Sequence, residues 1–183
     1  ANTPQLQVAP RAAIGGAAMI ISGSVITFDN GVQQRAAVWI QQNHQEPWTL
    51  LQLPDAGTHG EALSSICSQS PERCWVSGYA DGVVALWTVD TTAAPANGTR
   101  ESTLPRLQHD AEDAGPITVT SADRPALLVS HLGTSQLLVS DSQGWRTFTG
   151  PAGPVIDATT VDDRLYAITR APDGVALWTT NMP

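Results

Sequence analysis

The chain of 183 residues predicts an all-β fold, and two observations support that prediction. Its 15 Gly and 13 Pro are scattered rather than clustered, which is typical of many short strands joined by tight turns. The stretch CWVSGYADGVVALWTVD at 74–90 is an apolar strand, an Asp-Gly turn and a second apolar strand. Helices would need longer uninterrupted runs, and a chain of this length is sufficient for one ordinary domain.

The same hairpin pattern recurs along the chain. Copies lie at 73–90, 125–145 and 164–181, and a looser copy lies at 18–43. The residues that close the second strands are spaced about 40 to 50 residues apart, a repeat length typical of β-propeller blades rather than of helical solenoids. These residues are Trp39, Trp87, Val139 and Trp178. We therefore predict a four-bladed, β-propeller-like domain with blades at approximately 11–60, 61–115, 116–153, and 154–183 together with 4–10.

Apolar runs such as VVALW predict inner strands that are buried on both faces between neighbouring blades. More mixed segments that contain Pro predict outer edge strands, because an edge position does not need every N–H. The predicted outer strands are 48–54, 103–108 and 145–151, and the predicted first strands are 12–18, 62–68, 117–123 and 155–162. Alternatives are a partial propeller completed by another chain and, third, a β-sandwich.

The fourth repeat supplies only three strands before the sequence ends. Residues 4–10, PQLQVAP, share the apolar pattern and closing Pro of the predicted outer strands. We therefore expect them to pair with residues 175–180 and to close the ring.

Charge and hydropathy exclude two classes of partner. All nine basic residues are Arg and the formal net charge is −8, so the chain would repel a phosphate backbone and we expect no nucleic acid partner. The longest strongly apolar stretch, AAMII at 17–21, is too short to span a bilayer, which predicts no transmembrane segment. The first residues lack the features of a signal peptide, so an exported protein would be seen here as its mature chain.

The two cysteines give the only direct indication of a compartment. Cys67 and Cys74 flank the polar segment SQSPER, which resembles a loop between antiparallel strands. A disulfide between them would close a short loop and contribute roughly 2.5 kcal/mol in the chain-entropy model. Two free, buried thiols are the alternative, and a metal site has too few candidate ligands.

A search for catalytic or ligand-binding patterns identifies no site. Four histidines lie at turns or strand ends without ligand spacing: His44, His59, His109 and His131. The acidic cluster at 109–113 lacks the pattern of a calcium loop, and three serines lie in no nucleophile elbow: Ser24, Ser77 and Ser140. We therefore expect no catalytic residues, no metal, no cofactor and a protein that is not an enzyme, with binding residues left unassigned.

The run AAVWIQQNHQEPWTLLQLP, followed by ALSSICSQSPERCWVSGYADGVVALWTVD, resembles the blades of secreted actinobacterial β-propeller repeat proteins. SDSQGWRTF at 140–148 is similar to a degenerate Asp-box of sialidase-like blades, and the hairpins are similar to WD-like blades. The resemblance covers the chain from Arg11 onward. It implies an extracytoplasmic protein or lipoprotein, and it reinforces the expectation of a Cys67–Cys74 disulfide.

The function expected from these observations is a secreted or cell-envelope module that binds or scaffolds another protein, for example within a membrane-anchored envelope complex. The alternative is a glycan-binding, lectin-like or degenerate glycosidase-like propeller. Three tryptophans discriminate between the two: Trp48, Trp75 and Trp145. Stacking between blades favours a scaffold, whereas exposure around a central cavity favours a sugar ligand.

Overall fold

A computed structural model of the chain describes residues 6–14, 18–28, 31–43, 45–68, 73–108, 115–121, 124–131, 133–171 and 173–182. The described residues contain strands and no helix, so none of them forms an apolar helix that could cross a membrane. The strands are β1 (Leu6–Ile14), β2 (Met19–Thr27), β3 (Gln33–Gln41), β4 (Thr49–Gln52), β5 (Gly60–Cys67), β6 (Arg73–Ala80), β7 (Val83–Asp90), β8 (Asn97–Arg100), β9 (Ile117–Ser121), β10 (Arg124–His131), β11 (Thr134–Asp141), β12 (Gly144–Ala152), β13 (Val155–Val161), β14 (Arg164–Ala171) and β15 (Gly174–Asn181).

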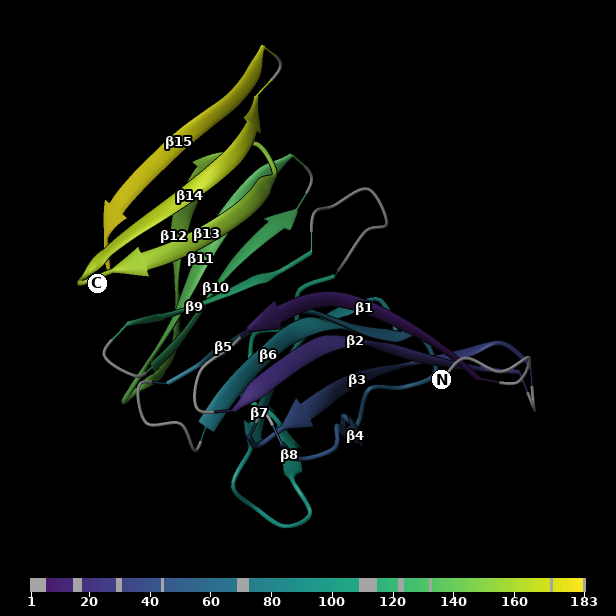
Figure 1. The fold of residues 1–183 in the computed structure, drawn as a ribbon. Helices are drawn as coiled ribbons and strands as arrows, with labels where there is room; N and C mark the ends of the chain where they lie inside the picture. Colours follow the sequence, from purple (N-terminus) through teal and green to yellow (C-terminus); the bar gives the residue numbers. More distant parts are fainter. Residues whose placement is uncertain are drawn as a thin grey trace.

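The strands form four antiparallel sheets, each a simple meander of strands consecutive in sequence. Sheet 1 contains β1–β4, sheet 2 contains β5–β8, sheet 3 contains β9–β12, and sheet 4 contains β13–β15. Figure 1 shows the sheets following one another in chain order, with sheets 1 and 4 at opposite ends of the array. The all-β, propeller-like fold of four blades predicted from the repeats is confirmed, and the array is open rather than a closed ring.

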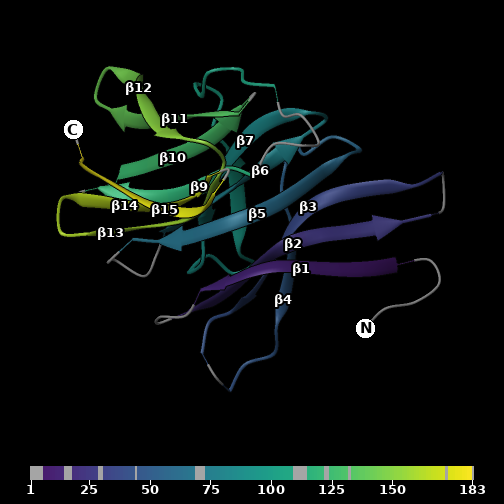
Figure 2. The same cartoon turned by 90° about the horizontal axis from the view of Figure 1, so that it is seen from above.

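Successive sheets pack through their first strands. Strand β5 contacts β1, β2 and β3; β9 contacts β5 and β6; and β13 contacts β9 and β10. Figure 2 shows the same array from above, with sheets 1 and 4 on different sides of it. This repeated sheet-on-sheet contact explains why the inner strands have apolar residues on both faces.

Three apolar clusters fill the spaces between neighbouring sheets. The sheet 1–2 core includes Ile20, Val38, Val76 and Trp87; the sheet 2–3 core includes Trp75, Leu86, Leu127 and Leu138; the sheet 3–4 core includes Leu128, Leu137, Val155 and Leu165. These side chains are nearly or fully buried. Each cluster joins two sheets that are adjacent in the sequence, so the array is held together by nearest-neighbour contacts.

The predicted first strand of blade one is misplaced. The structure has β1 at Leu6–Ile14, so only residues 12–14 of the predicted strand at 12–18 belong to it. The sequence interpretation treated Pro10 as the end of a segment. The register of the β1–β2 pair instead shifts between Pro10 and Ala12, at a β-bulge, where a residue without an N–H is tolerated.

The predicted outer strand of blade two is also wrong. Strand β8 is Asn97–Arg100, and residues 103–108 form no strand. The backbone N–H of Val84 donates to the carbonyl of Leu107 at 2.9 Å, so this segment returns to the start of β7. Its apolar residues, Leu104 and Leu107, pack against the sheet 2–3 core, and that burial explains the pattern that was interpreted as an edge strand.

Ring closure through the N-terminal segment is contradicted by the strand pairing. Leu6 pairs with Thr27 and Ile14 pairs with Ile20, so residues 6–14 are the first strand of sheet 1. Sheet 4 has the order β13-β14-β15, with β15 at its edge. The first part of the predicted segment, residues 4 and 5, lies outside the described residues. The prediction was wrong because an edge strand of sheet 1 and an edge strand of sheet 4 would have the same apolar pattern. The pattern therefore does not show which sheet the segment joins, and the segment pairs with β2.

The predicted disulfide is present. Cys67 and Cys74 are directly opposite each other in the β5–β6 pair, with a Cα–Cα distance of 3.9 Å and a disulfide bond between their sulfur atoms. The N–H of Ser68 donates to the carbonyl of Arg73 at 2.9 Å and continues the pairing beyond the bridge. Cys74 is fully buried in the sheet 1–2 core, so the disulfide joins the hairpin at a packed position.

Removing the bridge by the double substitution Cys67→Ser and Cys74→Ser is expected to lower the free energy of unfolding by about 2.5 kcal/mol. The loss follows from the greater freedom of the unfolded chain once the short loop is open. Urea denaturation of the oxidised protein and of the double variant measures the difference. Equal midpoints would show that the loop closure contributes nothing to stability, and the reduced wild type provides the control for the substitutions themselves.

Candidate functional site: a charged cleft at the turn end of sheet 2

The β6–β7 hairpin turns through Asp81 and Gly82, both in the left-handed region at φ 48° and 75°. A two-residue turn with both φ values positive matches the right-handed twist of the paired strands, and Asp-Gly is a preferred sequence for it. The Asp-Gly pair therefore predicted the turn. The turn also brings the Asp81 carboxylate to the surface at one end of sheet 2.

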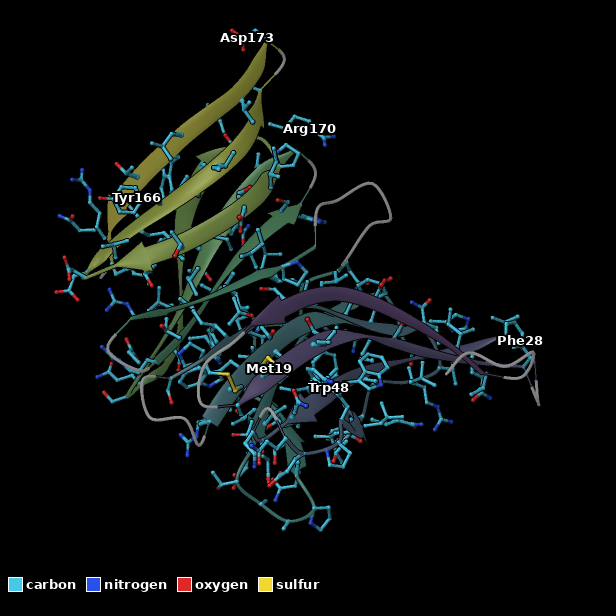
Figure 3. The ribbon with its side chains drawn as sticks, in the orientation of Figure 1. Met19, Phe28, Trp48, Tyr166, Arg170 and Asp173 are labelled. Carbon is cyan, nitrogen blue, oxygen red and sulfur yellow. A yellow bond between two sulfur atoms is a disulfide. The ribbon has the colours of Figure 1, made fainter. Side chains whose placement is uncertain are left out.

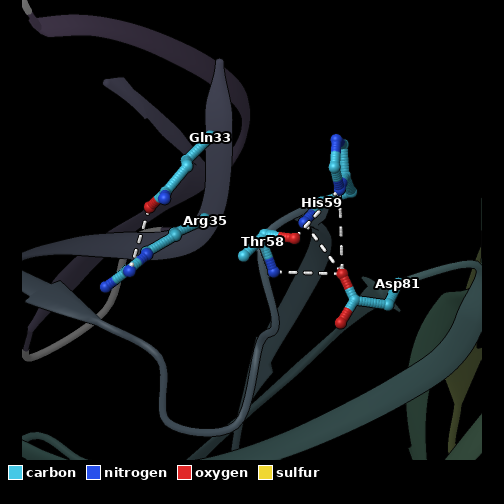
Figure 4. Close-up of polar contacts among 5 residues, drawn as sticks. All are labelled: Gln33, Arg35, Thr58, His59 and Asp81. Atoms are coloured by element: carbon cyan, nitrogen blue, oxygen red, sulfur yellow. Dashed lines mark hydrogen bonds and ion pairs between the residues drawn. The ribbon is translucent and has the colours of Figure 1, made fainter. Parts of the chain in front are cut away.

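The Asp81 side chain binds the segment that leads into β5. One carboxylate oxygen accepts the backbone N–H of Thr58 at 3.0 Å and that of His59 at 2.9 Å (Figure 4). The N–H of Asp81 donates to the carbonyl of His59 at 2.8 Å. The His59 Nδ1 atom lies 3.9 Å from the same carboxylate oxygen. The hairpin turn and the start of the first strand of sheet 2 are thus fixed to each other.

Gly57 makes this arrangement possible. Its φ is +70°, and a Cβ atom at this position would meet the Asp81 carboxylate. Any larger residue would therefore be strained in its backbone and would displace the carboxylate from the Thr58 and His59 N–H groups.

The pKa of the Asp81 carboxyl is lowered from its ordinary value of 3.8. The His59 N–H has the largest effect; partial burial opposes it, and the Thr58 N–H and the charges of His59 and Arg100 lower the pKa further. The carboxylate is therefore negatively charged at neutral pH and contributes a fixed charge to this end of sheet 2.

Replacing Asp81 with Asn tests that charge. Because the folded pKa is lowered, the stability due to the ionised carboxyl is present above 3.8 and is lost as the pH falls through the lower folded value. We expect the wild type to be more stable than the variant at neutral pH. The difference in stability should disappear once the pH is below the lowered pKa of the folded protein. Thermal denaturation of both proteins across the acid range measures it. Asn tolerates a positive φ, so a constant difference at every pH would indicate a backbone effect instead.

Beside this turn lies an open cleft of about 530 Å³. Side chains of both charges and apolar side chains line it, and the lining residues are Asp55, Ala80, Asp81, Val83, Val84, Arg100, Glu101, Ser102, Leu104, Pro105 and Arg106. They come from the β4–β5 connection, the β6–β7 hairpin, and the end of β8 with the segment that follows it. The cleft thus combines the three structural elements that meet at the turn end of sheet 2.

Several lining residues are held by hydrogen bonds. The Arg100 guanidinium donates to the carbonyl of Asp55, which has a positive φ of 52°. The Glu101 carboxylate accepts both the N–H and the hydroxyl of Thr103, at 2.9 and 2.7 Å. The walls of the cleft are therefore ordered by contacts within the protein, and ordered walls reduce the entropy lost when a ligand binds.

The chemistry that this cleft supports is polar recognition. The lining contains the carboxylates of Asp55, Asp81 and Glu101, the guanidiniums of Arg100 and Arg106, and apolar side chains, so a ligand with both charges and some apolar surface would find complementary groups. Among the described residues, no group of three or more His, Cys, Asp or Glu side chains is placed to hold a metal ion.

Trp48, Trp75 and Trp145 were expected to discriminate between a scaffold and a glycan-binding protein. Trp75 is buried, and Trp145 is half-buried against the same sheet 2–3 core. Trp48, labelled in Figure 3, is 41% exposed and directly precedes β4, the outer strand of sheet 1. None of the three lines the cleft. Two of the three are thus packing residues between sheets.

Two of the four histidines, His44 and His109, and the acidic cluster at 109–113 lie outside the described residues. His131 ends β10 and is not among the residues that line the cleft, whereas His59 lies next to Asp81. The sequence analysis missed the His59–Asp81 pair, because the two residues are 22 positions apart and only the β5–β6–β7 meander brings them together. The Asp-Gly turn was the available signal, since it fixes where an Asp side chain must lie.

The serines that were considered as nucleophiles have structural contacts. The Ser77 hydroxyl is buried, donates to the carbonyl of Pro116 at 2.9 Å and accepts from the Thr118 hydroxyl at 2.6 Å. Ser24 is buried and accepts from the Gln34 side chain at 3.1 Å, and Ser140 pairs with Trp145 across β11 and β12. Ser77 therefore connects sheet 2 to the segment that begins sheet 3.

No protein-family model matches the chain, and no curated protein sequence matches it. Among solved structures, a glutaminyl cyclase from Myxococcus xanthus is similar at 15% identity and a TM-score of 0.40, covering 94% of this chain and 69% of that one. An engineered GH43 glycoside hydrolase with endo-xylanase and exo-arabinofuranosidase activity is similar at 12% identity and a TM-score of 0.29, covering 96% of this chain and 51% of that one. At these scores neither match transfers an activity to this chain.

The expectation that the protein is not an enzyme is corrected by these comparisons. Both matched structures are enzymes. The expectation relied on the absence of short catalytic motifs in the sequence. A propeller-like fold assembles its sites from loops distant in sequence, so missing motifs do not exclude catalysis.

Proposed function

We propose that the protein is an extracytoplasmic protein-binding module, and that the charged cleft at the turn end of sheet 2 receives a polar segment of its partner. The observation that supports this most is that one cleft is lined by carboxylates, guanidiniums and apolar side chains together. Such a surface favours a peptide segment that carries opposite charges, since each charge gains a partner and the apolar atoms gain contact.

The Cys67–Cys74 disulfide supports the extracytoplasmic part of the proposal. Structural disulfides form and persist in oxidising compartments and are rare in the cytosol. A partner within a cell-envelope complex is consistent with that compartment. The glycan-binding alternative has less support, because Trp75 and Trp145 pack between sheets and do not form a stacking surface.

Site-specific cross-linking tests the proposal. A photoreactive residue replaces Ser102, an exposed residue of the cleft, and the full chain is exposed to the envelope fraction of its source organism. A matched variant carries the same photoreactive residue at Ser142, in the exposed turn between β11 and β12. We expect a protein adduct from position 102 that is absent from position 142.

A second substitution links the adduct to the charges. Arg106→Glu reverses a guanidinium of the cleft, and Arg146→Glu reverses an exposed guanidinium on sheet 3. The adduct from position 102 should weaken in the first variant and persist in the second. An adduct that is equally strong in both, or equally strong from positions 102 and 142, would contradict recognition through the cleft.

A further inference from the structure

The outward face of sheet 4 exposes large apolar side chains. Ile168 on β14 and Leu177 on β15 are directly opposite each other and are 43% and 68% exposed. Val175 is 69% exposed and pairs with Arg170 on the same face, which is the side of the sheet that carries Tyr166 and Arg170 in Figure 3. An exposed sheet face of this kind marks a contact surface.

The position of the Ile168–Leu177 pair is the same in every sheet. The second and third strands of each sheet form a hairpin, and the last residue pair before its turn serves as the reference. Three residues away from the turn on both strands lies the cross-strand pair that is compared here. These pairs are Ser24–Ala36, Ser77–Leu86, Leu128–Leu137 and Ile168–Leu177. The first three pairs are at most 2% exposed, because the following sheet covers them.

The edge of sheet 4 is also less covered than the corresponding strands of sheets 1 to 3. In sheets 1 to 3 the third strand pairs with a fourth strand, whereas β15 is the edge of sheet 4 among the described residues. Every residue of β15 is exposed or half-buried. An exposed edge strand with apolar side chains favours association with another β-sheet.

At the opposite end of the array, the outer face of sheet 1 also carries apolar side chains. Ile21, Trp39 and Leu50 are neighbours across β2, β3 and β4, on the side away from sheet 2. Ile21 and Trp39 are half-buried, and Leu50 is 40% exposed. The pair at the Ile21–Trp39 position of sheet 2 is Cys74–Val89, which is fully buried against sheet 1.

We propose that a second copy of this chain covers the outward face of sheet 4 with the outer face of its own sheet 1. The contact would repeat the sheet-on-sheet packing that joins sheets 1 to 2, 2 to 3 and 3 to 4. It is a head-to-tail contact between two different surfaces, so two or more copies continue the array and a suitable rotation closes it into a ring.

Single substitutions on the two faces test the proposal. Leu177→Asp and Leu50→Asp place a charge at the centre of one face each, and both side chains are exposed enough to leave the fold intact. Val32→Asp is the matched control, because Val32 is 63% exposed and precedes β3, outside the strands that form the two faces. Analytical ultracentrifugation over a wide range of protein concentration measures the oligomeric state, and circular dichroism checks the fold.

The wild type and Val32→Asp are expected to associate, while Leu177→Asp and Leu50→Asp each remain monomeric. Mixing the two monomeric variants is expected to restore a dimer, because one copy retains an intact sheet 4 face and the other an intact sheet 1 face. A wild type that stays monomeric at every concentration overturns the proposal. A dimer that is sensitive to Leu177→Asp but not to Leu50→Asp also overturns it, since it would use the sheet 4 face twice.

Discussion

Replacing Trp87 with Ala is expected to lower the free energy of unfolding by about 3–5 kcal/mol. Trp87 is fully buried in the sheet 1–2 core, and its indole N–H donates to the carbonyl of Pro54 at 2.8 Å. The substitution removes the largest fully buried side chain and leaves a cavity between two sheets, together with a carbonyl that loses its donor. Chemical denaturation measures the difference.

Two further variants separate the contributions. Trp87→Phe keeps most of the apolar volume and loses only the N–H donor, so its stability should lie between those of the wild type and Trp87→Ala. Trp48→Ala is the surface control, because Trp48 is 41% exposed and its loss should change stability little. If Trp87→Ala were no less stable than Trp48→Ala, the packing of sheet 1 on sheet 2 would not depend on this residue.

Gly78→Ala is expected to reduce stability by about 3 kcal/mol, which is large for one added methyl group. Gly78 lies opposite Ala62 in the β5–β6 pair, next to the bulge between Ala62 and Ser64. A Cβ atom at Gly78 would meet the backbone carbonyl of Glu61, so β5 itself would have to move. Thermal and chemical denaturation report the loss.

Gly98→Ala is the matched control for this prediction. Gly98 lies in β8, and a Cβ there would be in ordinary contact with Pro54 and Leu53, at 3.4 and 3.5 Å. This substitution should be neutral or slightly stabilising, because Ala restricts the unfolded chain more than Gly does. Equal stabilities for Gly78→Ala and Gly98→Ala would mean that the β5–β6 approach is adaptable.

The sequence predicted the central hairpins well, because their signals are local. The Asp81-Gly82 turn and the apolar runs on each side fix the β6–β7 hairpin without knowledge of the rest of the chain. The outer strand β8 could not be found in this way. Its residues, NGTR, lie at an exposed edge and need no apolar pattern, whereas Leu104 and Leu107 resemble a strand only because they cover the sheet 2–3 core.

The candidate site was less predictable than the fold. Asp81 was visible as a turn residue, but its contact with His59 depends on the β5–β6 register. The cleft also needs Arg100, which ends a strand that the sequence did not reveal, and Arg106, which follows that strand. A site that several loops assemble is therefore predictable only after strand pairing is known.

The linear order of the sheets has a consequence for how the molecule opens. Sheets 2 and 3 are each covered on two sides, whereas sheets 1 and 4 each share an apolar core with a single neighbour. In such an array, local unfolding begins at the ends and propagates inward, because an end sheet loses one interface and an inner sheet loses two. In a single copy, amide hydrogens of β14 should accordingly exchange with solvent earlier than those of β6 and β10, and protection should rise stepwise toward the middle of the chain.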